Sequence, residues 1–477
     1  MSNDSRLQFE VSLGRMNSQR RDDSDPPVVT ILGDFSGSQT APAGAAVLKR
    51  QALSFETLTD LFADLKPTVT LPNGSETLRP CRVTLASIDD FHPDRLLEIV
   101  PACRRVSDLL RALDKEAQQA SAAAELRQLL DANDASASDA ASAQTPQPVA
   151  ETTAADAAAE DDAGMFERLL GRETGAQRAI DDLLKDTIAT ALEGHSSAAE
   201  DDALKQLRQQ GLAMLTTLLR AVLTEPVFQQ LERNWLGVDL LLRRVDDSLA
   251  GFDLIDLPWQ TLEAELANEL PLSESPSYRA VTEHPQLPRP KLMIALYSVG
   301  EHMAELSVLA RLGACAAQCD AQLLAQGSLA LCGCHSLTEA ASPQDWRPAA
   351  SEPAAFWQAL RDHPAGGALR LATPRFALRQ PYGSRTDAIE RFDFEELPTA
   401  PAHEAFCWGN PALLCAIAML NSDATVTDLP MALYKDAGGE AIMPCTEVLL
   451  SGTAAAQIAN GGLMPLRARR DAGTVVL

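Results

Sequence analysis

The feature that most limits how this chain can fold is an acidic, alanine-rich segment from Asp131 to Gly164. It consists almost entirely of Ala, Asp, Ser, Thr, Pro, Gln and Glu, and it contains no Lys, Arg or aromatic residue. Such a segment buries too little apolar surface to offset the entropy lost on folding, and its carboxylates repel one another. We therefore expect a disordered linker over 131–164 between an N-terminal module, 1–130, and a C-terminal module, 165–477.

Charge and length narrow the class of protein. A chain of 477 residues with 46% apolar residues is long enough for more than one core. Its formal charge of -26 argues against binding nucleic acid or an anionic membrane through bulk electrostatics. We expect a protein that acts through protein surfaces.

Targeting signals and cysteine usage indicate a reducing cytoplasm. The N-terminal sequence MSNDSRLQFE has no apolar signal-peptide core. The longest apolar candidate, Leu212–Leu223, is short and carries Arg220, so no membrane span is expected. Nine cysteines, an odd number without framework spacing, fit buried thiols in a reducing compartment.

Periodicity predicts strands alternating with helices, which is typical of α/β packing. Expected strands cover 7–13, 28–32, 81–87, 292–297, 328–334, 368–372 and 447–450. Expected helices cover 54–65, 93–113, 165–192, 203–245, 304–325, 411–420 and 454–458. The predicted fold class is α/β, with mixed α+β character, in two modules.

Two motifs mark the N-terminal half. The apolar run Val28–Leu32 leads into the turn Gly33-Asp34-Phe35-Ser36-Gly37. The run Ser87-Ile88-Asp89-Asp90-Phe91-His92-Pro93-Asp94-Arg95 precedes a Leu-rich helical pattern. Strand, GDFSG and DDFHPDRL in this order resemble the small sheath subunit of type VI secretion systems, the TssB/VipA family, over residues 7–130.

The C-terminal half carries a second ordered set of motifs. They are Pro226–Gly237 (PVFQQLERNWLG), Ala372–Arg379, Pro381–Thr386 (PYGSRT), Phe392–Glu396 (FDFEE), Trp408–Pro411 (WGNP), Pro444–Ser451 and Gly462–Leu466. This set resembles the large sheath subunit of the same systems, the TssC/VipB family, over residues 165–475. The family's large subunit continues beyond the last motif, so the end at Leu477 suggests a module without that C-terminal region and puts ordinary sheath polymerisation in question.

The resemblance implies that two normally separate, interlocking proteins are joined here. A flexible tether makes docking of the modules intramolecular, at an effective concentration on the order of millimolar. The implied function is structural: a sheath-like component of a contractile apparatus. The implied partners are other sheath or baseplate subunits, including further copies of this chain. Assembly or structural roles are assigned to Gly33, Asp34, Phe35, Ser36, Gly37, Asp90, Phe91, His92, Pro93, Trp235, Arg379, Pro381, Tyr382, Gly383, Phe394, Glu395, Glu396, Trp408, Gly409 and Asn410.

Each motif that could carry chemistry has a structural interpretation that we favour. GDFSG lacks the Lys-Ser/Thr pair of a P-loop, and Ser36 stands in the wrong position for a GxSxG nucleophile. Asp89, Asp90, His92 and Asp94 could hold a metal, but Pro93 places them at a helix start.

Two further clusters are weighed in the same way. Cys332, Cys334 and His335, with His302, resemble a metal site, but their spacing is too tight and no second pair follows. A cysteine nucleophile paired with His335 or His403 lacks an oxyanion element. Arg375, Arg379, Arg385 and Arg391 could suggest a nucleic-acid face, but adjacent acids favour an ion-pair network.

We therefore predict no enzyme activity, catalytic residue, metal ligand or cofactor. A non-polymerising adaptor or regulator that binds sheath subunits or effectors is the alternative. An enzyme with a Cys/His site is the third class, and it predicts bound zinc or a reactive thiol.

Overall fold

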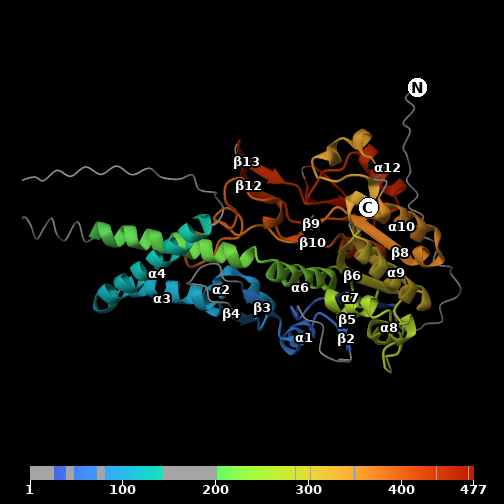
Figure 1. The fold of residues 1–477 in the computed structure, drawn as a ribbon, viewed down its shortest axis with the longest axis horizontal. Helices are drawn as coiled ribbons and strands as arrows, with labels where there is room; N and C mark the ends of the chain where they lie inside the picture. The colour runs from blue at the N-terminus through green and yellow to red at the C-terminus, as the bar shows by residue number, and fades with distance from the viewer. Residues whose placement is uncertain are drawn as a thin grey trace, which may run out of the picture.

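The computed structural model describes residues 26–38, 48–71, 81–142 and 201–477, apart from 285, 301, 348–350, 437 and 471. The largest unit within these residues is a seven-stranded sheet in the order β14-β8-β7-β6-β1-β5-β2. Figure 1 labels β8, β6, β5 and β2 of this sheet, which follow one another in that order. Its strands are β1 (Val28–Gly33), β2 (Arg50–Leu53), β5 (Gly251–Asp256), β6 (Leu292–Val299), β7 (Gln322–Gly327), β8 (Leu369–Thr373) and β14 (Leu463–Pro465). Only β2 is antiparallel to its neighbour. The predicted mixed α/β class is confirmed.

Strand β1 comes from the N-terminal half, yet it lies between two strands of the C-terminal half. Ile31 of β1 is paired with Leu254 of β5 on one side and with Ile294 of β6 on the other. Edge strand β2 also belongs to the N-terminal half and pairs with β5. The two halves therefore contribute to a single sheet.

Helices cover both faces of this sheet, as parallel strands require. Consecutive side chains of a strand point to opposite faces, so Ile31 packs into one core and Leu32 into the other. The first face is covered by α1 (Leu58–Leu65), α6 (Pro226–Arg244) and α11 (Pro411–Asn421). The second face is covered by α7 (Trp259–Ala267), α8 (Pro276–Thr282), α9 (Met303–Gln318), α10 (Glu352–Asp362) and α12 (Gly452–Asn460).

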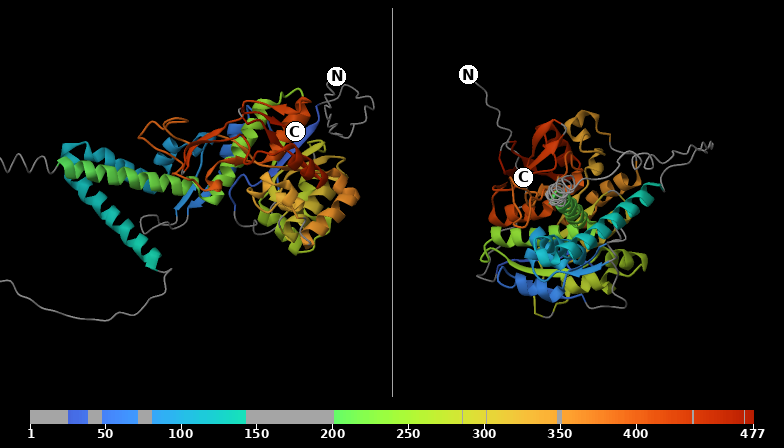
Figure 2. Two further views of the ribbon diagram at one scale, coloured as in Figure 1. Left: turned by 90° about the horizontal axis from the view of Figure 1, so that it is seen from above. Right: turned by 90° about the vertical axis from the view of Figure 1, so that its left-hand side faces the viewer.

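A helical arm extends from the first face. It consists of α3 (Pro101–Leu113), α4 (Glu116–Ser142) and the helix Asp201–Leu223, and Figure 2 shows it reaching away from the sheet. The helices approach closely at Gly211, where an added Cβ would lie 2.8 Å from Leu110 Cδ2 and 3.0 Å from Leu126 Cδ2. A small residue at this crossing lets helices from both halves of the chain pack together.

Short β elements surround the main sheet. They are the pairs β3 (Thr68–Leu71) with β4 (Cys81–Thr84), β9 (Phe376–Ala377) with β10 (Trp408–Gly409), and β12 (Ala432–Asp436) with β13 (Gly439–Met443), and the group β11 (Thr425–Val426), β15 (Arg467–Ala468) and β16 (Val475–Val476). Helix α2 (Pro93–Ile99) links the β3–β4 hairpin to the arm.

The strongest local patterns are confirmed. The strands expected at 28–32, 292–297 and 368–372 are β1, β6 and β8, and the helices expected at 411–420 and 454–458 are α11 and α12. The strand expected at 81–87 forms as β4 but ends at Thr84. The helix expected from Ser54 begins only at Leu58, because Ser54 and Thr57 bond to each other in a preceding turn.

Two long helices of the prediction are interrupted at prolines. Helices α2 and α3 meet at Val100 before Pro101, and the helix Asp201–Leu223 is bent by 66° relative to α6, which begins at Pro226. Proline has no N–H for the helix, and it disfavours helical geometry in the residue before it. Each interruption redirects the chain between the arm and the sheet.

Three assignments near the sheet are wrong. The helix expected to reach residue 325 ends at Gln318, and the rest becomes β7, because pairing with β6 and β8 decides an apolar run that periodicity leaves ambiguous. The expected strand 328–334 is instead a short 3-10 turn, η4 (Leu329–Cys332). The segment 447–450 forms no regular strand, and only the preceding Thr446 makes an isolated bridge, to Phe376.

The first part of the expected linker is helical in the structure. Residues 131–142 continue helix α4, consistent with the high helix propensity of alanine. The remainder of the linker, 143–164, lies outside the described residues, as do the strand expected at 7–13 and the helix expected at 165–192.

Across the described part of the chain, no single helix is long and apolar enough to cross a membrane. The helix Asp201–Leu223 and α6 reach the required length and hydropathy only when taken together across their bend.

Candidate functional site

The first site is the contact between the GDFSG turn and helix α6, which we call the junction: residues 33–37 with Phe228–Trp235. Strand β1 ends at Gly33, and the Asp34 carboxylate accepts the Gly37 backbone N–H at 2.7 Å. Gly37 has φ +72, and an added Cβ would lie 2.4 Å from the Thr68 carbonyl oxygen. Only glycine fits this position without strain.

Side chains from the C-terminal half satisfy the polar backbone of this turn. Asn234 Nδ2 donates to the Asp34 carbonyl at 2.8 Å, and Trp235 Nε1 donates to the Phe35 carbonyl at 3.0 Å. Asp256, at the end of β5, accepts the Phe35 and Ser36 N–H groups at 2.7 and 3.2 Å. Because buried backbone groups need partners, these contacts fix the turn against the C-terminal half.

Aromatic rings from both halves surround these hydrogen bonds. The Trp235 ring centroid lies 5.2 Å from that of Phe35 and 4.6 Å from that of Phe62, and Phe91 lies 5.4 Å from Phe228. All five rings are almost completely buried. Large aromatic side chains contribute much of the apolar burial at a contact, so this cluster carries much of the stability of the junction.

Burial also raises the pKa values of two carboxyl groups at the turn, those of Asp34 and Asp256. Desolvation raises the pKa of Asp34 to about 6, and the nearby Asp256 carboxylate adds to the rise. Backbone N–H groups oppose the shift but do not cancel it. Burial likewise raises the pKa of Asp256. The junction therefore holds two acidic side chains whose charged forms are disfavoured.

The DDFHP motif is a helix start, as predicted. Asp90 accepts the Ala86 and Ser87 N–H groups at 2.6 and 3.1 Å, and His92 Nδ1 accepts the Asp94 N–H at 3.2 Å at the N-terminus of α2. Pro93 occupies the first turn of α2, where its missing N–H costs nothing. The polar residues of this motif thus cap helices.

The same motif contacts residues 381–396 of the C-terminal half, which we call the PYG–FEE segment. The His92 and Tyr382 ring centroids lie 4.9 Å apart, and Asp94 accepts the Glu390 N–H at 3.0 Å. Arg391 forms an ion pair with Glu98 of α2. Motifs of the two halves that lie almost 300 positions apart therefore meet in space.

Arg379 connects the PYG–FEE segment to α6. Its guanidinium binds Glu232 Oε1 and Glu396 Oε2, each at 2.7 Å, and lies 4.2 Å above the Tyr382 ring. Burial disfavours its charge, but the two carboxylates outweigh this effect and raise its pKa above the ordinary value. Glu396 also accepts the Tyr382 N–H at 2.7 Å.

The neighbouring residues of the PYG and FEE motifs close this cluster. An added Cβ on Gly383 would lie 2.4 Å from Glu395 Oε2, and Ser384 donates its hydroxyl to Glu395 Oε1 at 2.7 Å. Phe394 is buried against Phe392, and Pro381 accepts a bond from Thr386. The ion pairs expected from the sequence do form within the chain, for Arg375, Arg379, Arg385 and Arg391.

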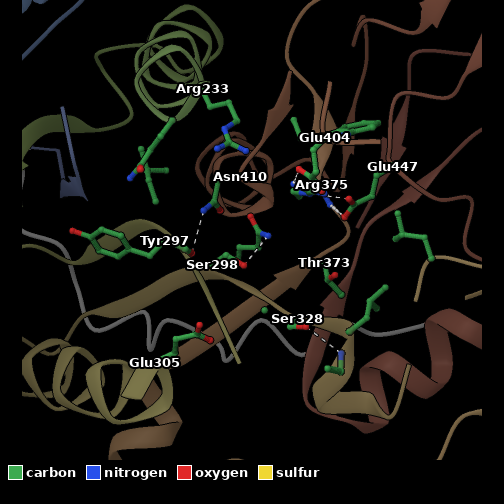
Figure 3. A pocket seen from close by; sticks show the side chains of 18 of the residues that line it. Arg233, Tyr297, Ser298, Glu305, Ser328, Thr373, Arg375, Glu404, Asn410 and Glu447 are labelled. Atoms are coloured by element: carbon green, nitrogen blue, oxygen red, sulfur yellow. Dashed lines mark hydrogen bonds and ion pairs between the residues drawn. The ribbon is translucent and has the colours of Figure 1, made fainter. Parts of the chain in front are cut away.

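The WGNP motif lies elsewhere, at a polar cleft of about 690 Å³ (Figure 3). Trp408 Nε1 donates to the His403 carbonyl at 2.9 Å, and the two rings stack with centroids 4.9 Å apart. Asn410 accepts the Ala412 N–H at the start of α11 and donates to the Tyr297 carbonyl of β6 at 3.3 Å. The motif therefore holds one wall of the cleft.

Arg375 is the most constrained charged group of the cleft. It forms a bidentate pair with Glu404, at 2.7 and 2.9 Å, and its Nε lies 2.8 Å from Glu447 Oε2. His403 Nε2 lies 3.0 Å from the same carboxylate oxygen. Burial raises the pKa of Glu447, but the bonds from His403 and Arg375 outweigh that effect and lower it overall.

The cysteine cluster at 332–335 shows no sign of reactivity. Cys332 and Cys334 are buried, and burial raises the pKa of Cys332 to about 12. A thiol with a raised pKa is a poor nucleophile. No group of three or more His, Cys, Asp or Glu side chains is placed to hold a metal ion among the residues that the structure describes.

Sequence reasoning missed several residues that line these sites or hold them together: Glu232, Arg233, Asn234, Asp256, Glu404 and Glu447. Glu232 could have been found, because it lies four residues after Phe228 and so shares the buried face of α6. Asp256 and Glu404 carry no local signal, since their partners are distant in sequence.

Comparisons with known proteins agree with this architecture. The family model described as EvpB/VC_A0108, tail sheath N-terminal domain, matches residues 212–477. The type VI secretion system sheath protein TssC1 of Pseudomonas aeruginosa is 24% identical over 323 residues. That alignment covers 62% of this chain and 65% of the relative, so the chain spans just under two thirds of the relative's length.

The match includes α6, the PYG–FEE segment, the WGNP motif and most of the strands of the main sheet. Tail sheath proteins are structural components, and the family is not an enzyme family. The family model matches more than half of the residues of this chain. The chain therefore belongs to the tail sheath family of type VI secretion systems, as a relative of the large TssC/VipB subunit.

Proposed function

We propose that this chain is a structural component of a type VI secretion contractile apparatus in which a small-subunit module, 1–130, and a large-subunit module, 165–477, dock within one polypeptide. The observation that carries the proposal is the position of β1, between β5 and β6. Family membership and the TssC1 relative support the sheath role.

The contacts of β1 explain why docking within the chain is favourable. Val29, Ile31 and Leu32 are fully buried, and both edges of the strand are paired. Removing β1 exposes the apolar faces of β5 and β6 and leaves their backbone groups without partners. The C-terminal half therefore needs this strand, and a covalent tether supplies it at a fixed one-to-one ratio.

The partners that we propose are other sheath or baseplate subunits, with self-association of this chain as one form. The proposed location is the cytoplasm of a bacterial cell, where the related sheath proteins work. The proposed mechanism is mechanical. The junction and the Arg379 cluster, which is Arg379 with Glu232, Glu396 and Tyr382, hold the two modules as one unit. Assembly uses the outer surfaces of that unit. No bond-making chemistry is assigned to the chain.

Cleavage between the modules tests the docking. A specific protease site inserted between Thr152 and Thr153 allows the chain to be cut after folding. We expect the two fragments to coelute in gel filtration, because β1 remains paired in the sheet. Separation of native, folded fragments contradicts the proposal.

A matched pair of substitutions sharpens this test. Ile31→Asp places a charge at the centre of the sheet and should prevent coelution, because an unpaired charge is strongly disfavoured in a core. Ile442→Asp makes the same change at a side chain that is 64% exposed and should leave coelution intact. Equal behaviour of the two variants would rule out β1 as the docking element.

Electron microscopy of the purified chain tests the assembly role. Tubes or rings, formed alone or with the inner-tube and baseplate proteins of the same system, are the expected result. Particles that stay monomeric at high concentration, with no binding to those proteins in a pull-down, contradict the sheath role. Monomers that do bind sheath subunits indicate the non-polymerising adaptor instead.

A further inference from the structure

The polar cleft lies where ligands bind in many open α/β sheets, outside the carboxyl ends of parallel strands. Its floor includes Ser298, Gly327 and Thr373, at the ends of β6, β7 and β8. Helices α6 and α7 and the segment around Trp408 form its walls. A volume of about 690 Å³ is in the range of small-molecule sites.

Arg233 is a cation in this cleft that forms no ion pair with the described residues, although the carboxylates of Glu404 and Glu232 lie close enough to act on its charge. Its Nε donates to the Gln229 carbonyl of its own helix at 3.0 Å, and no carboxylate of the described residues lies within ion-pair distance of its guanidinium. Figure 3 shows the side chain pointing from α6 toward Asn410. Burial lowers the pKa of Arg233, which marks it as a desolvated charge.

The carboxylates that line the cleft already have partners within the chain. Glu404 and Glu447 bind Arg375, and Glu447 also contacts His403. Glu305 accepts the Gly300 N–H at 2.9 Å at the start of α9. A partly buried guanidinium with open N–H donors favours an anionic ligand, since carboxylates and phosphates match its geometry.

Other lining groups match hydroxyl groups of such a ligand. The buried Oε1 of Gln260 accepts no hydrogen bond from the described residues, and Gln230 and Ser298 add further amide and hydroxyl groups. The partly buried ring of Trp259 supplies a flat apolar wall. Several hydrogen-bonding side chains, an aromatic face and the Arg233 guanidinium suit a molecule that is rich in hydroxyls and carries an acidic group.

We propose that the cleft binds a small polyhydroxylated anion, a sugar phosphate or a sugar acid, with Arg233 holding the anionic group and the amide side chains holding hydroxyls. This binding function goes beyond the sheath role and does not depend on it. On this proposal, a small soluble metabolite binds in the cleft of the folded chain.

Calorimetry with three probes tests the proposal on the full chain. Ribose 5-phosphate and gluconate represent the two acidic groups, and uncharged ribose is the control. We expect at least one anion to bind about tenfold or more tightly than ribose, because a hydrogen-bonded charge contributes at least that much. The tighter anion identifies the acidic group. Equal binding of all three probes, or none by either anion, overturns the proposal.

Variants locate the binding at Arg233. Arg233→Gln should raise the Kd of the tighter anion about tenfold, whereas Arg243→Gln, at an exposed position of the same helix, should leave it within about twofold. Arg233→Lys keeps the charge without the planar fork and should give an intermediate Kd. Unchanged affinity in a folded Arg233→Gln or Arg233→Lys protein contradicts the assignment.

Discussion

Adjacent residues of helix α6 behave in opposite ways. Asn234 and Trp235 are buried, and both donate to carbonyls of the GDFSG turn. Arg233, one position earlier, faces the polar cleft, and its terminal guanidinium nitrogens have no partner in the described chain. One helix thus holds two sites, a closed junction and an open cleft.

The difference lies in the hydrogen-bond partners of the polar side chains. A donor that is paired within the chain supports the fold, whereas a donor without such a partner is available to a ligand. At the junction, the hydrogen bonds of Asn234 and Trp235 join the two halves of the chain, so losing either donor leaves a buried carbonyl unpaired. In the cleft, the free donors are available to a group from outside the chain. The following predictions compare these two kinds of position, from the largest expected effect to the smallest.

The largest effect is expected from Trp235→Ala at the junction. The change removes one of the two largest fully buried side chains and leaves the Phe35 carbonyl without its donor. We expect the free energy of unfolding to fall by about 5 kcal/mol, measured by urea titration. Trp259→Ala, at a partly buried position of the cleft, is the control and should cost clearly less. Equal losses would remove the distinction between junction and cleft.

A slightly smaller loss is expected from Arg379→Ala. The substitution leaves Glu232 and Glu396 buried without their counter-charge, which should cost about 4 kcal/mol of unfolding free energy. Arg385→Ala removes an exposed arginine paired with Glu440 and should cost no more than about 1 kcal/mol. Thermal and urea unfolding of both variants measure the contrast. Similar losses in the two variants would show that burial of the Arg379 cluster contributes nothing special.

A pH-dependent effect is expected from Asp34→Asn. The pKa of Asp34 is raised from 3.8 to about 6 in the folded protein, so the folded state binds this proton more tightly than the unfolded chain does. Its contribution to stability is therefore complete below pH 3.8 and is lost as the pH rises through about 6. The loss amounts to at most about 3 kcal/mol.

Asparagine keeps an oxygen for the Gly37 N–H but cannot ionise. The variant should match the wild type near pH 4 and be more stable near pH 7, as measured by urea titration across this range. Asp64→Asn, an exposed position on α1, is the control and should show no such divergence. A variant that is less stable than the wild type at pH 7 would refute this assignment.

The smallest effect is expected from Arg233→Gln without ligand. Because Arg233 forms no ion pair with the described residues, its replacement should change the unfolding free energy by no more than about 0.5 kcal/mol. A loss as large as that of Arg379→Ala would show that Arg233 supports the fold, and the contrast within α6 would then fail. The same urea titration provides the measurement.

Some of this organisation could be predicted from local sequence. The apolar runs of β1, β6 and β8 and the capping residues around Pro93 have signals that depend only on near neighbours. The turn at Gly37 also follows from sequence, because glycine tolerates the backbone angle found there. These elements appear as expected because no distant contact competes with them.

Other elements depended on distant partners. The run that became β7 has the composition of either a helix end or a buried strand, and its pairing with β6 and β8 decided the outcome. Glu232 pairs with Arg379, 147 positions away, and no local pattern predicts that partner. Arg233 looks like any exposed helical arginine in the sequence, and only the fold places it in a cleft.

The sequence by itself determined the α/β class and the motifs that resemble sheath subunits, because composition and periodicity act over a few residues. The tertiary structure alone decided that β1 lies between β5 and β6, and that Asn234 and Trp235 close the junction while Arg233 stays open. The physical reason is that hydrogen-bond partners and burial are set by contacts between residues hundreds of positions apart, which no local pattern encodes.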